Sequence, residues 1–539
     1  MVSTSHKPNF IEDPVVREAV GGFATRSERA EDLERLVATF VDSGILGLVD
    51  NSKNQVIYGR RGTGKTHLLR VIEARFGADE TTVVTYLDAR TLGSSELFTD
   101  TDRPLHLRFL GLYRDVIAVL HNALFYALAS GQRGNVDAAL STLAEIERQL
   151  LYKESDAESV RAREAETASQ HTGGEFGASL SATNLALTGT ASDSQSRVVE
   201  AAVERTSAQT AKVIFPALHA AFTKLMGDME LSRFVILIDE WSSVPLDLQP
   251  YLAELLNRVF FANPRITVKI ASLEFRSRFS TVSPEGVKQF GLELGGDLET
   301  AVDLDDFYVY DRDPAGTEKL FADLLFRHIS ANISNEGYLD AQFGISGPAD
   351  FRQIVFTEQA FKELVRAAEG VARDLLQIFL KAYTRAWKTA AAHVTVPTVT
   401  AAAQDWYESD KQSNLSDSQH RLLRQLVEQV IGTRRARSFL VAREDSSSPL
   451  LRSLIDQRVV HVIRKGYADK DNPGIRYNIY TLDYGCYVDL KGTLGAPQFE
   501  LALNLSEEDG APVVPFDDNR SIRRIVLPRD LLFPSLASP

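Results

Sequence analysis

The spacing of apolar residues predicts alternating strands and helices through the N-terminal half of the chain. Short runs of apolar, largely β-branched residues predict buried strands, and apolar residues three and four positions apart predict helices between them. This alternation is typical of an α/β fold with a parallel sheet flanked by helices. The predicted strands are 55–58, 81–88, 234–238, 266–272 and 303–310, and the predicted helices include 27–41, 67–76 and 248–261.

The C-terminal half has a different pattern, in which helices predominate. Helical spacing over 316–333 and 357–369, and a helix that opens after Gly370, predict a small helical lid. Beyond it, three helices precede two strands, which is the order of a winged helix-turn-helix. The predicted elements of this last domain are helices 419–431, 434–443 and 449–457 and strands 458–465 and 475–482.

These changes of pattern predict the domain boundaries. The stretch 105–226 is too long for the usual strand-helix units of roughly 30 residues, and it predicts an inserted, partly helical subdomain. Its Gly/Ser/Thr/Ala tract at 172–196 predicts a flexible insertion, or alternatively a small β-hairpin used for contacts. We expect a lead-in over 1–20, an α/β core over 21–315, a helical lid over 316–400, a winged-helix domain over 415–493 and a tail over 494–539 that packs back on the core.

Composition narrows the class of protein. The chain of 539 residues is 44% hydrophobic and 24% charged, values typical of a soluble globular protein with several domains. It has no long apolar run that predicts a membrane span and no apolar segment near its polar N-terminus that predicts a signal peptide. The single cysteine, Cys486, cannot form an internal disulfide, which fits a cytoplasmic location. The net charge of −14 requires that any nucleic-acid contact come from a local basic patch.

The strongest chemical signal is a glycine-rich loop between the predicted strand 55–58 and the helix after it. Glycines let backbone N–H groups point at phosphate oxygens, and a helix N-terminus adds partial positive charge. Lys65 can reach the terminal phosphates, and the hydroxyl of Thr66 can ligate Mg²⁺. The residues predicted to bind a nucleotide are Gly59, Arg60, Arg61, Gly62, Thr63, Gly64, Lys65, Thr66 and His67.

A second signal follows the apolar run 234–238, which ends in two carboxylates. The carboxyl edge of a buried parallel strand is where ligands meet the sheet. Asp239 can hold Mg²⁺ through water, and Glu240 can orient and deprotonate an attacking water. Downstream of a phosphate loop, these two residues predict a site for nucleotide hydrolysis.

Other catalytic candidates depend on weaker patterns. Ser272 or Glu274, at the end of strand 266–272, could touch the γ-phosphate or the attacking water. Arg276 or Arg278 could act on the nucleotide of a neighbouring subunit, which would imply a homo-oligomer. Arg373 lies one turn into a lid helix and could reach back to the phosphates.

Basic residues are concentrated in one part of the chain. Between 420 and 476 they outnumber acidic residues, although the whole chain is acidic. This local reversal is typical of a module that binds double-stranded DNA, and the alternative is a winged domain used for protein contacts. The candidate DNA contacts are Arg434, Arg435, Arg437, Arg452, Arg464, Lys465 and Lys470.

The loop 59–66, the strand 234–240, the segment 370–374 and the trailing winged helix together resemble the AAA+ ATPases of the origin-recognition-complex (ORC)-like initiator branch. The resemblance implies ATP as the nucleotide, Arg26 beside the adenine and Arg373 as the second sensor. The usual first-sensor asparagine is missing, and the long insertion is unusual for an initiator. The chain is thus similar to relatives that are not replication initiators, such as ATPases of mobile elements and of antiphage defence.

Two functions remain open at this point. The first is an ATP- and Mg²⁺-dependent switch that presents the winged domain to DNA and releases it after hydrolysis through Glu240. The second is a signalling or assembly NTPase whose winged domain and 105–226 insertion bind proteins. A scaffold without hydrolysis is disfavoured because Lys65, Thr66, Asp239 and Glu240 are all intact.

Overall fold

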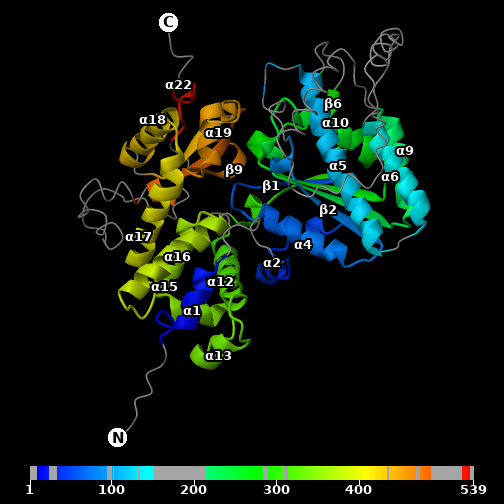
Figure 1. Ribbon diagram of the computed structural model, residues 1–539. Coiled ribbons are helices and arrows are strands. Elements are labelled where there is room, and N and C mark those ends of the chain that lie inside the picture. The colour runs from blue at the N-terminus through cyan, green and yellow to red at the C-terminus, as the bar shows by residue number, and fades with distance from the viewer. Residues whose placement is uncertain are drawn as a thin grey trace, which may run out of the picture. The chain divides into compact units, whose positions relative to one another are not determined.

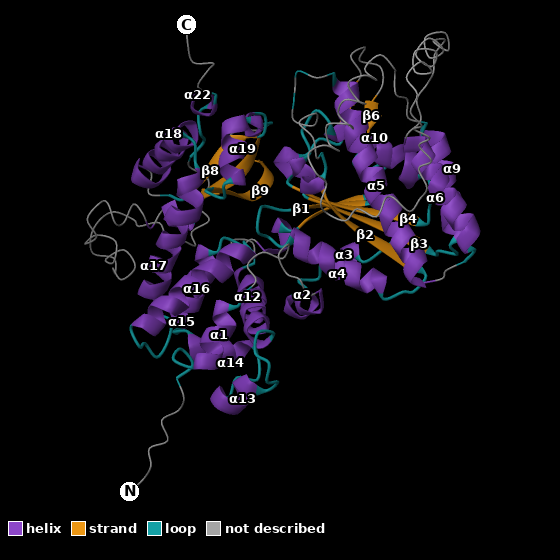
Figure 2. Cartoon of the chain, in the orientation of Figure 1, coloured by secondary structure: helices purple, strands orange, loops and turns teal. Residues whose placement is uncertain are grey.

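The computed structural model divides into two compact units. The first comprises Met1–Arg90, Val235–Pro250 and Ile266–Pro539, and the second comprises Thr91–Phe234 and Tyr251–Arg265. Figure 1 shows the elements in chain order and Figure 2 shows their type. The structure describes residues 9–23, 33–93, 100, 102, 104–131, 134–150, 214–282, 289–308, 313–433, 436–468, 474–486, 488 and 525–533.

The first unit contains a parallel sheet. Its described strands have the order β2-β3-β4-β1-β7, and β1 pairs in parallel with both β4 and β7. Helices flank the sheet, so the predicted α/β fold class is confirmed. The strands are β1 (Gln55–Tyr58), β2 (Thr82–Asp88), β3 (Arg233–Asp239), β4 (Ile266–Ser272) and β7 (Thr300–Asp303).

The apolar content of these strands explains their place in the sheet. Every residue of β4, and every residue of β3 after Arg233, is buried, as expected for a parallel strand covered on both faces. Helix α4 (Lys65–Gly77) covers one face with Leu68, Leu69 and Ile72, which pack in one cluster with residues of β1 and β3. The short helices α2 (Leu33–Thr39) and α3 (Leu46–Val49) precede β1.

The lid has a hydrophobic core of its own, to which the N-terminal residues contribute. The sequence predicts a lead-in over 1–20, whereas α1 (Pro14–Gly21) buries Val16, Ala19 and Val20 in this core. The hydroxyl of Tyr383 also donates to the carbonyl of Ile11, at 2.9 Å. The other lid helices are α12 (Pro314–Ser330), α13 (Tyr338–Phe343), α14 (Pro348–Val355), α15 (Glu358–Ala367), α16 (Ala372–Lys388) and α17 (Val396–Trp406).

The C-terminal domain joins helices to an antiparallel sheet with the described strand order β8-β10-β9. Residues 525–533, which include α22 (Arg529–Leu532), return to pack in its core, and Val526 forms a bridge with Leu440. The sequence predicts a tail that packs on the core, but the described residues of the tail pack in the C-terminal domain. The winged-helix assignment stays a prediction. The remaining elements are α18 (Asp417–Leu426), η9 (Val427–Thr433), β8 (Ser438–Ala442), α19 (Pro449–Asp456), β9 (Val460–Ala468) and β10 (Arg476–Leu482).

Two predicted elements are wrong. The strand expected over 303–310 is instead the end of β7 followed by α11 (Asp305–Tyr308), because acidic residues in the first turn favour a helix start. The helix expected over 434–443 is strand β8 from Ser438 onward. An apolar run as short as Phe439–Val441 is compatible with either structure, and pairing with β10 makes it a strand.

The second unit is helical where the structure describes it. Helix α5 (Leu105–Gly131) packs on α6 (Val136–Leu150), α6 packs on α9 (Phe215–Asp228), and α9 packs on the segment η5 (Leu256–Phe261). Phe260 of η5 meets Phe222 of α9 edge-on, with ring centroids 5.0 Å apart. Helix α10 (Gln249–Leu255) continues directly into η5, which is π-helical, so the helix predicted over 248–261 is confirmed. The tract 172–196 lies outside the described residues. No described helix is both long and apolar enough to cross a membrane.

Candidate active site

The glycine-rich loop joins β1 to α4 in a conformation that needs its glycines. Gly62 and Gly64 have φ angles of +84° and +99°, which are strained for any residue with a Cβ. A Cβ at Gly62 would also lie 2.8 Å from the Cβ of Arg373. Because Gly64 caps α4 directly, the first N–H groups of that helix are available to an anion.

Lys65 is folded across this loop. Its Nζ donates to the carbonyl oxygens of Gly59 at 2.8 Å and Arg60 at 3.0 Å. Burial lowers its pKa, while the carboxylates of Glu240 and Asp239 oppose the change. The ammonium therefore satisfies its donors within the loop and can exchange carbonyl oxygens for phosphate oxygens.

Thr66 and Asp239 meet at the predicted metal site. The Thr66 hydroxyl donates to Asp239 Oδ2 at 2.6 Å, and the backbone N–H of Glu240 donates to Asp239 Oδ1 at 2.8 Å. A hydroxyl and a buried carboxylate are the hard oxygen ligands that Mg²⁺ takes beside phosphates. The donor set fits that ion.

Glu240 follows in an uncommon backbone conformation. Its φ of +51° lies in the left-handed region, where residues other than glycine are strained. Burial raises its pKa, and the neighbouring charge of Asp239 adds to this effect. A carboxylate with a raised pKa is a stronger base toward a water molecule.

Tyr86 is a site residue that the sequence does not reveal. Its hydroxyl donates to Asp239 Oδ2 at 2.6 Å, and its ring lies below the guanidinium of Arg70, 3.5 Å from the ring centroid. A tyrosine in a half-buried strand is ordinary in a sequence. Only the sheet order, with β2 beside β3, brings it to Asp239.

Ser272 and Glu274, the two residues predicted to touch the γ-phosphate or the attacking water as the first sensor, contact different partners. Ser272 is buried at the end of β4, where its hydroxyl lies 3.2 Å from that of Ser242 and also contacts Ser277. Glu274 forms an ion pair with Lys465 of the C-terminal domain. The structure therefore places Ser272 among hydroxyls and Glu274 at the contact with β9.

The two arginines predicted to act as an arginine finger, on the nucleotide of a neighbouring subunit, also have different partners. Arg276 forms an ion pair with Asp456 at the end of α19. Arg278 is exposed and donates to the hydroxyl of Thr281 at 2.8 Å. Of these two arginines, Arg278 is the more accessible to another molecule.

Arg373 lies against the phosphate loop. Its backbone N–H, in the first turn of α16, donates to the carbonyl of Gly62 at 3.0 Å. The lid and the loop are thus in direct contact at the predicted second sensor. Arg61 is exposed, and His67 directs Nε2 at the carbonyl of Leu36, 2.6 Å away. Arg26 lies outside the described residues.

Arg60 has a different position from the one its motif suggests. Its backbone N–H and Nε donate to the carboxylate of Asp305 at 3.1 and 2.9 Å, and Nη2 donates to the carbonyl of Glu369 at 2.9 Å. Nη1 contacts Nδ1 of His461 in β9. The side chain therefore connects the phosphate loop to the lid and to the C-terminal domain instead of pointing at a nucleotide.

His461 continues this connection. Burial lowers its pKa to about 4, so the ring is neutral at pH 7. Nε2 lies 2.8 Å from Asp483 Oδ2 and must carry the proton, because a carboxylate only accepts. Nδ1 is then the acceptor for Arg60.

A buried ionic network extends from Asp483 into the lid. Lys411 Nζ lies 2.6 Å from Asp483 and 2.8 Å from Asp374, and Arg458 contacts Asp374 and Asp410. Nearby, Glu369, His461 and Asp483 are close enough together to suggest a metal site. Arg60, Arg437 and Lys411 already occupy those three groups, so this cluster does not fit a cation.

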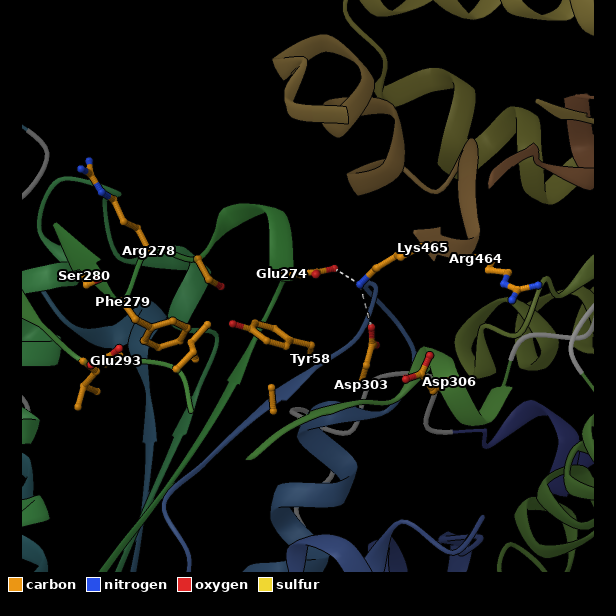
Figure 3. Close-up of a pocket in the computed structure, with 14 residues that line it drawn as sticks. Tyr58, Glu274, Arg278, Phe279, Ser280, Glu293, Asp303, Asp306, Arg464 and Lys465 are labelled. Carbon is orange, nitrogen blue, oxygen red and sulfur yellow. Dashed lines mark hydrogen bonds and ion pairs between the residues drawn. The ribbon is translucent and has the colours of Figure 1, made fainter. Parts of the chain in front are cut away.

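The predicted DNA contacts divide into inward and outward side chains. Arg437 pairs with Glu369, and Arg452 lies over the ring of Phe275, 5.5 Å from its centroid. Lys465 reaches between Glu274 and Asp303, beside a cavity of about 950 Å³, while the exposed Arg464 points away (Figure 3). Arg434, Arg435 and Lys470 lie outside the described residues.

The family is identified by the segment that contains the phosphate loop and the carboxylates of Asp239 and Glu240. A comparison with protein-family models matches residues 24–288 to the family described as ORC-CDC6-like. This segment is ORC-CDC6-like. The resemblance to the ORC-like branch of the AAA+ ATPases is confirmed there. The ORC-CDC6-like segment holds the phosphate loop, Asp239 and Glu240, and it ends before the lid and the C-terminal domain.

Several solved structures are similar to the chain at low identity. Cdc6p from Pyrobaculum aerophilum is 10% identical, with 88% of this chain and 95% of that chain covered and a TM-score of 0.32. ORC of Drosophila bound to DNA is 13% identical, with 92% and 94% covered and a TM-score of 0.32. The RuvB Holliday junction branch migration motor of Thermotoga maritima is 9% identical, with 86% and 94% covered and a TM-score of 0.32. No curated protein sequence matches the chain.

Proposed function

We propose that the protein is an ATPase that binds ATP with Mg²⁺ and hydrolyses it. The observation that carries the proposal is the 2.6 Å hydrogen bond between Thr66 and Asp239, at the end of a phosphate loop that contains Lys65. Mg²⁺ bound by these two residues supplies positive charge to the phosphate oxygens during phosphoryl transfer. The ORC-CDC6-like match over the same segment supports the choice of ATP.

Each residue then has a separate task. Lys65 exchanges the carbonyls of Gly59 and Arg60 for oxygens of the terminal phosphate. Glu240 orients the attacking water and accepts its proton. Arg373 contacts the phosphates from the lid, and its backbone hydrogen bond to Gly62 keeps it near the loop.

We also propose that the nucleotide controls contact with double-stranded DNA through the C-terminal domain. The supporting observation is the contact between Arg60 in the phosphate loop and His461 in β9. When phosphates rearrange the loop, Arg60 transmits the change to this domain. Lys465 and Arg437 then leave their carboxylate partners and become available to DNA phosphates, beside the exposed Arg464.

A second candidate function is a signalling or assembly NTPase in which the C-terminal domain binds protein. The inward ion pairs of Arg437 and Lys465, in a chain of net charge −14, favour it. In that case these pairs only close the domain over the nucleotide. Exposed Arg278 could serve a neighbouring copy of the chain in either function.

The test compares wild type with Glu240→Gln, and with Glu358→Gln as a control at a distant lid helix. ATP turnover and binding to a DNA duplex are measured at low and moderate salt. We expect Glu240→Gln to bind ATP, to lose hydrolysis by at least roughly a hundredfold, since general-base catalysis contributes about 10²–10⁴-fold, and to hold DNA more tightly.

The control variant should behave as wild type in both assays. DNA affinity that falls steeply with salt supports phosphate contacts. Absence of DNA binding at low salt with hydrolysis intact would favour the protein-binding function. Absence of ATP hydrolysis by wild type under all conditions would contradict the ATPase itself.

A further inference from the structure

Tyr86 and Thr66 donate to the same carboxylate oxygen of Asp239. Both distances to Oδ2 are 2.6 Å. The Thr66 hydroxyl is the group that the proposed function assigns to the metal. The Tyr86 hydroxyl approaches from β2, the strand beside β3.

The ring of Tyr86 is fixed by the helix that carries Thr66. Arg70 lies one turn after Thr66 on α4, on the same helix face, and its guanidinium stacks on the Tyr86 ring at 3.5 Å from the centroid. Arg70 also pairs with Glu73 at 2.7 Å, which limits its own freedom. Tyr86 is therefore held by α4 through its ring and holds β3 through its hydroxyl.

The Tyr86 hydroxyl is a permanent donor near neutral pH. Burial raises its pKa, and the charge of Asp239 and the hydrogen bond to it raise the pKa further. The phenol therefore keeps its proton near neutral pH and donates it to the Asp239 carboxylate.

We propose that Tyr86 is a positioning residue that holds the Asp239 carboxylate toward Thr66 for binding of the magnesium–nucleotide complex. The inference rests on the proposed ATPase function. A hydroxyl that ligates a metal uses an oxygen lone pair and keeps its proton, so Thr66 can continue to donate to Asp239. Tyr86 is the second donor to Oδ2 and, unlike Thr66, has no metal to bind, so its hydrogen bond limits rotation of the carboxylate from the side of β2.

The test uses Tyr86→Phe, which keeps the ring and its stacking with Arg70 and removes only the hydroxyl. The matched control is Tyr338→Phe, which removes a Tyr–Asp hydrogen bond of 3.0 Å to Asp13 in the lid. Binding of a fluorescent ATP analogue is titrated with Mg²⁺ and with a chelator, and the Mg²⁺ concentration for half-maximal hydrolysis is measured alongside it.

We expect Tyr86→Phe to weaken nucleotide binding in Mg²⁺ and to raise its Mg²⁺ requirement by at least roughly tenfold, since loss of a partner behind a metal ligand typically costs 10–100-fold. Binding in chelator should equal that of wild type. Tyr338→Phe should match wild type in each measurement, which shows that loss of a Tyr–Asp bond elsewhere does not produce the effect.

An equal loss of binding with Mg²⁺ and with chelator would show that Tyr86 only supports packing, and an unchanged Mg²⁺ requirement would also overturn the proposal. Either result leaves the ATPase proposal intact. By contrast, a wild-type protein that binds no nucleotide in Mg²⁺ refutes both. A folding defect is recognised separately from the far-ultraviolet circular dichroism of each variant.

Discussion

In the phosphate loop, the absence of a side chain at Gly62 allows the loop to contact the lid. Gly62 has a positive φ, and its carbonyl accepts the backbone N–H of Arg373. A Cβ there would lie within 3.0 Å of side chains at both Val371 and Arg373. The lid can approach the loop this closely only because residue 62 is a glycine.

Gly62→Ala should therefore damage the nucleotide site more than backbone strain alone predicts. A left-handed conformation costs an L-residue roughly 1–2 kcal/mol, and the contact with Arg373 adds to that. Gly44→Ala is the matched control, since Gly44 has a φ of +94° with open space around its Cβ position. We expect both variants to lose stability in thermal unfolding, and only Gly62→Ala to lose ATP affinity by at least tenfold. Equal ATP affinity in the two variants would contradict this account.

Residues of the site differ in how far the sequence could predict them. Lys65, Thr66 and Asp239 follow from local motifs, and the structure brings them together as expected. The motif also includes Arg60, whose side-chain direction depends on Asp305 and His461, 245 and 401 residues away. Contacts at such separations leave no periodic signal in the sequence.

Among the helices and strands, the sequence predicts an element correctly where its apolar pattern is compatible with only one type of secondary structure. Strands β1 and β4 match their predicted bounds, because short buried strands next to strong helical patterns are distinctive. Strand β8 was mistaken for a helix because partners far along the chain decide its structure. The predicted biology of mobile elements or antiphage defence stays a prediction, as no element of the fold bears on it.

The contact between the segment after β4 and helix α19 has a consequence for catalysis between subunits. Arg276 is paired with Asp456, so it cannot serve a neighbour while this ion pair persists. Asp456→Asn removes the charge that holds it, and we expect ATP turnover to rise severalfold and to depend more steeply on protein concentration. The cost in stability should be about 1 kcal/mol or less, because Arg276 is partly exposed. The measurement is turnover as a function of protein concentration.

Two further variants interpret that result. Asp445→Asn is a control, since it weakens the 3.4 Å ion pair with Arg529 in the same domain, and its turnover should equal that of wild type. Adding Arg276→Ala to Asp456→Asn should remove the gain. If the gain survives, Arg276 is not the finger and Arg278 becomes the stronger candidate.

For the whole molecule, the buried connection through His461 makes stability depend on pH. Burial lowers the pKa of His461 from 6.5 to about 4, and it lowers that of His328 to about 4 as well. As pH falls from 6.5 toward 4, the unfolded chain takes up protons that the folded chain refuses, so folding stability decreases. One pKa unit corresponds to about 1.4 kcal/mol, which makes the contribution of each histidine a few kcal/mol.

We expect His461→Gln to flatten part of this dependence. The free energy of unfolding is measured by denaturant titration from pH 7 to pH 4.5, with the exposed His393→Gln as control. The variant should lose less stability than wild type over this range, while the control loses as much. Two buried carboxylates, Asp374 and Asp483, affect the folding stability at lower pH than the histidines do. Burial raises the pKa of each, but the positive charges of Arg458 and Lys411, respectively, lower it by more. The stability that these carboxylates contribute is therefore lost only as the pH falls below about 3.8. Equal slopes in variant and wild type would show that His461 does not titrate in this way.

The packing of α1 into the lid also affects how the chain is made. Tyr383, which binds the carbonyl of Ile11, is synthesised 372 residues later. At roughly 5–20 residues per second, α1 leaves the ribosome about 20 to 70 seconds before its partner exists. For most of that interval α12 and the later lid helices, against which Val16, Ala19 and Val20 pack, have not yet been synthesised. Burial of α1 therefore waits for the lid helices, so this segment completes its folding only after most of the intervening chain has been made.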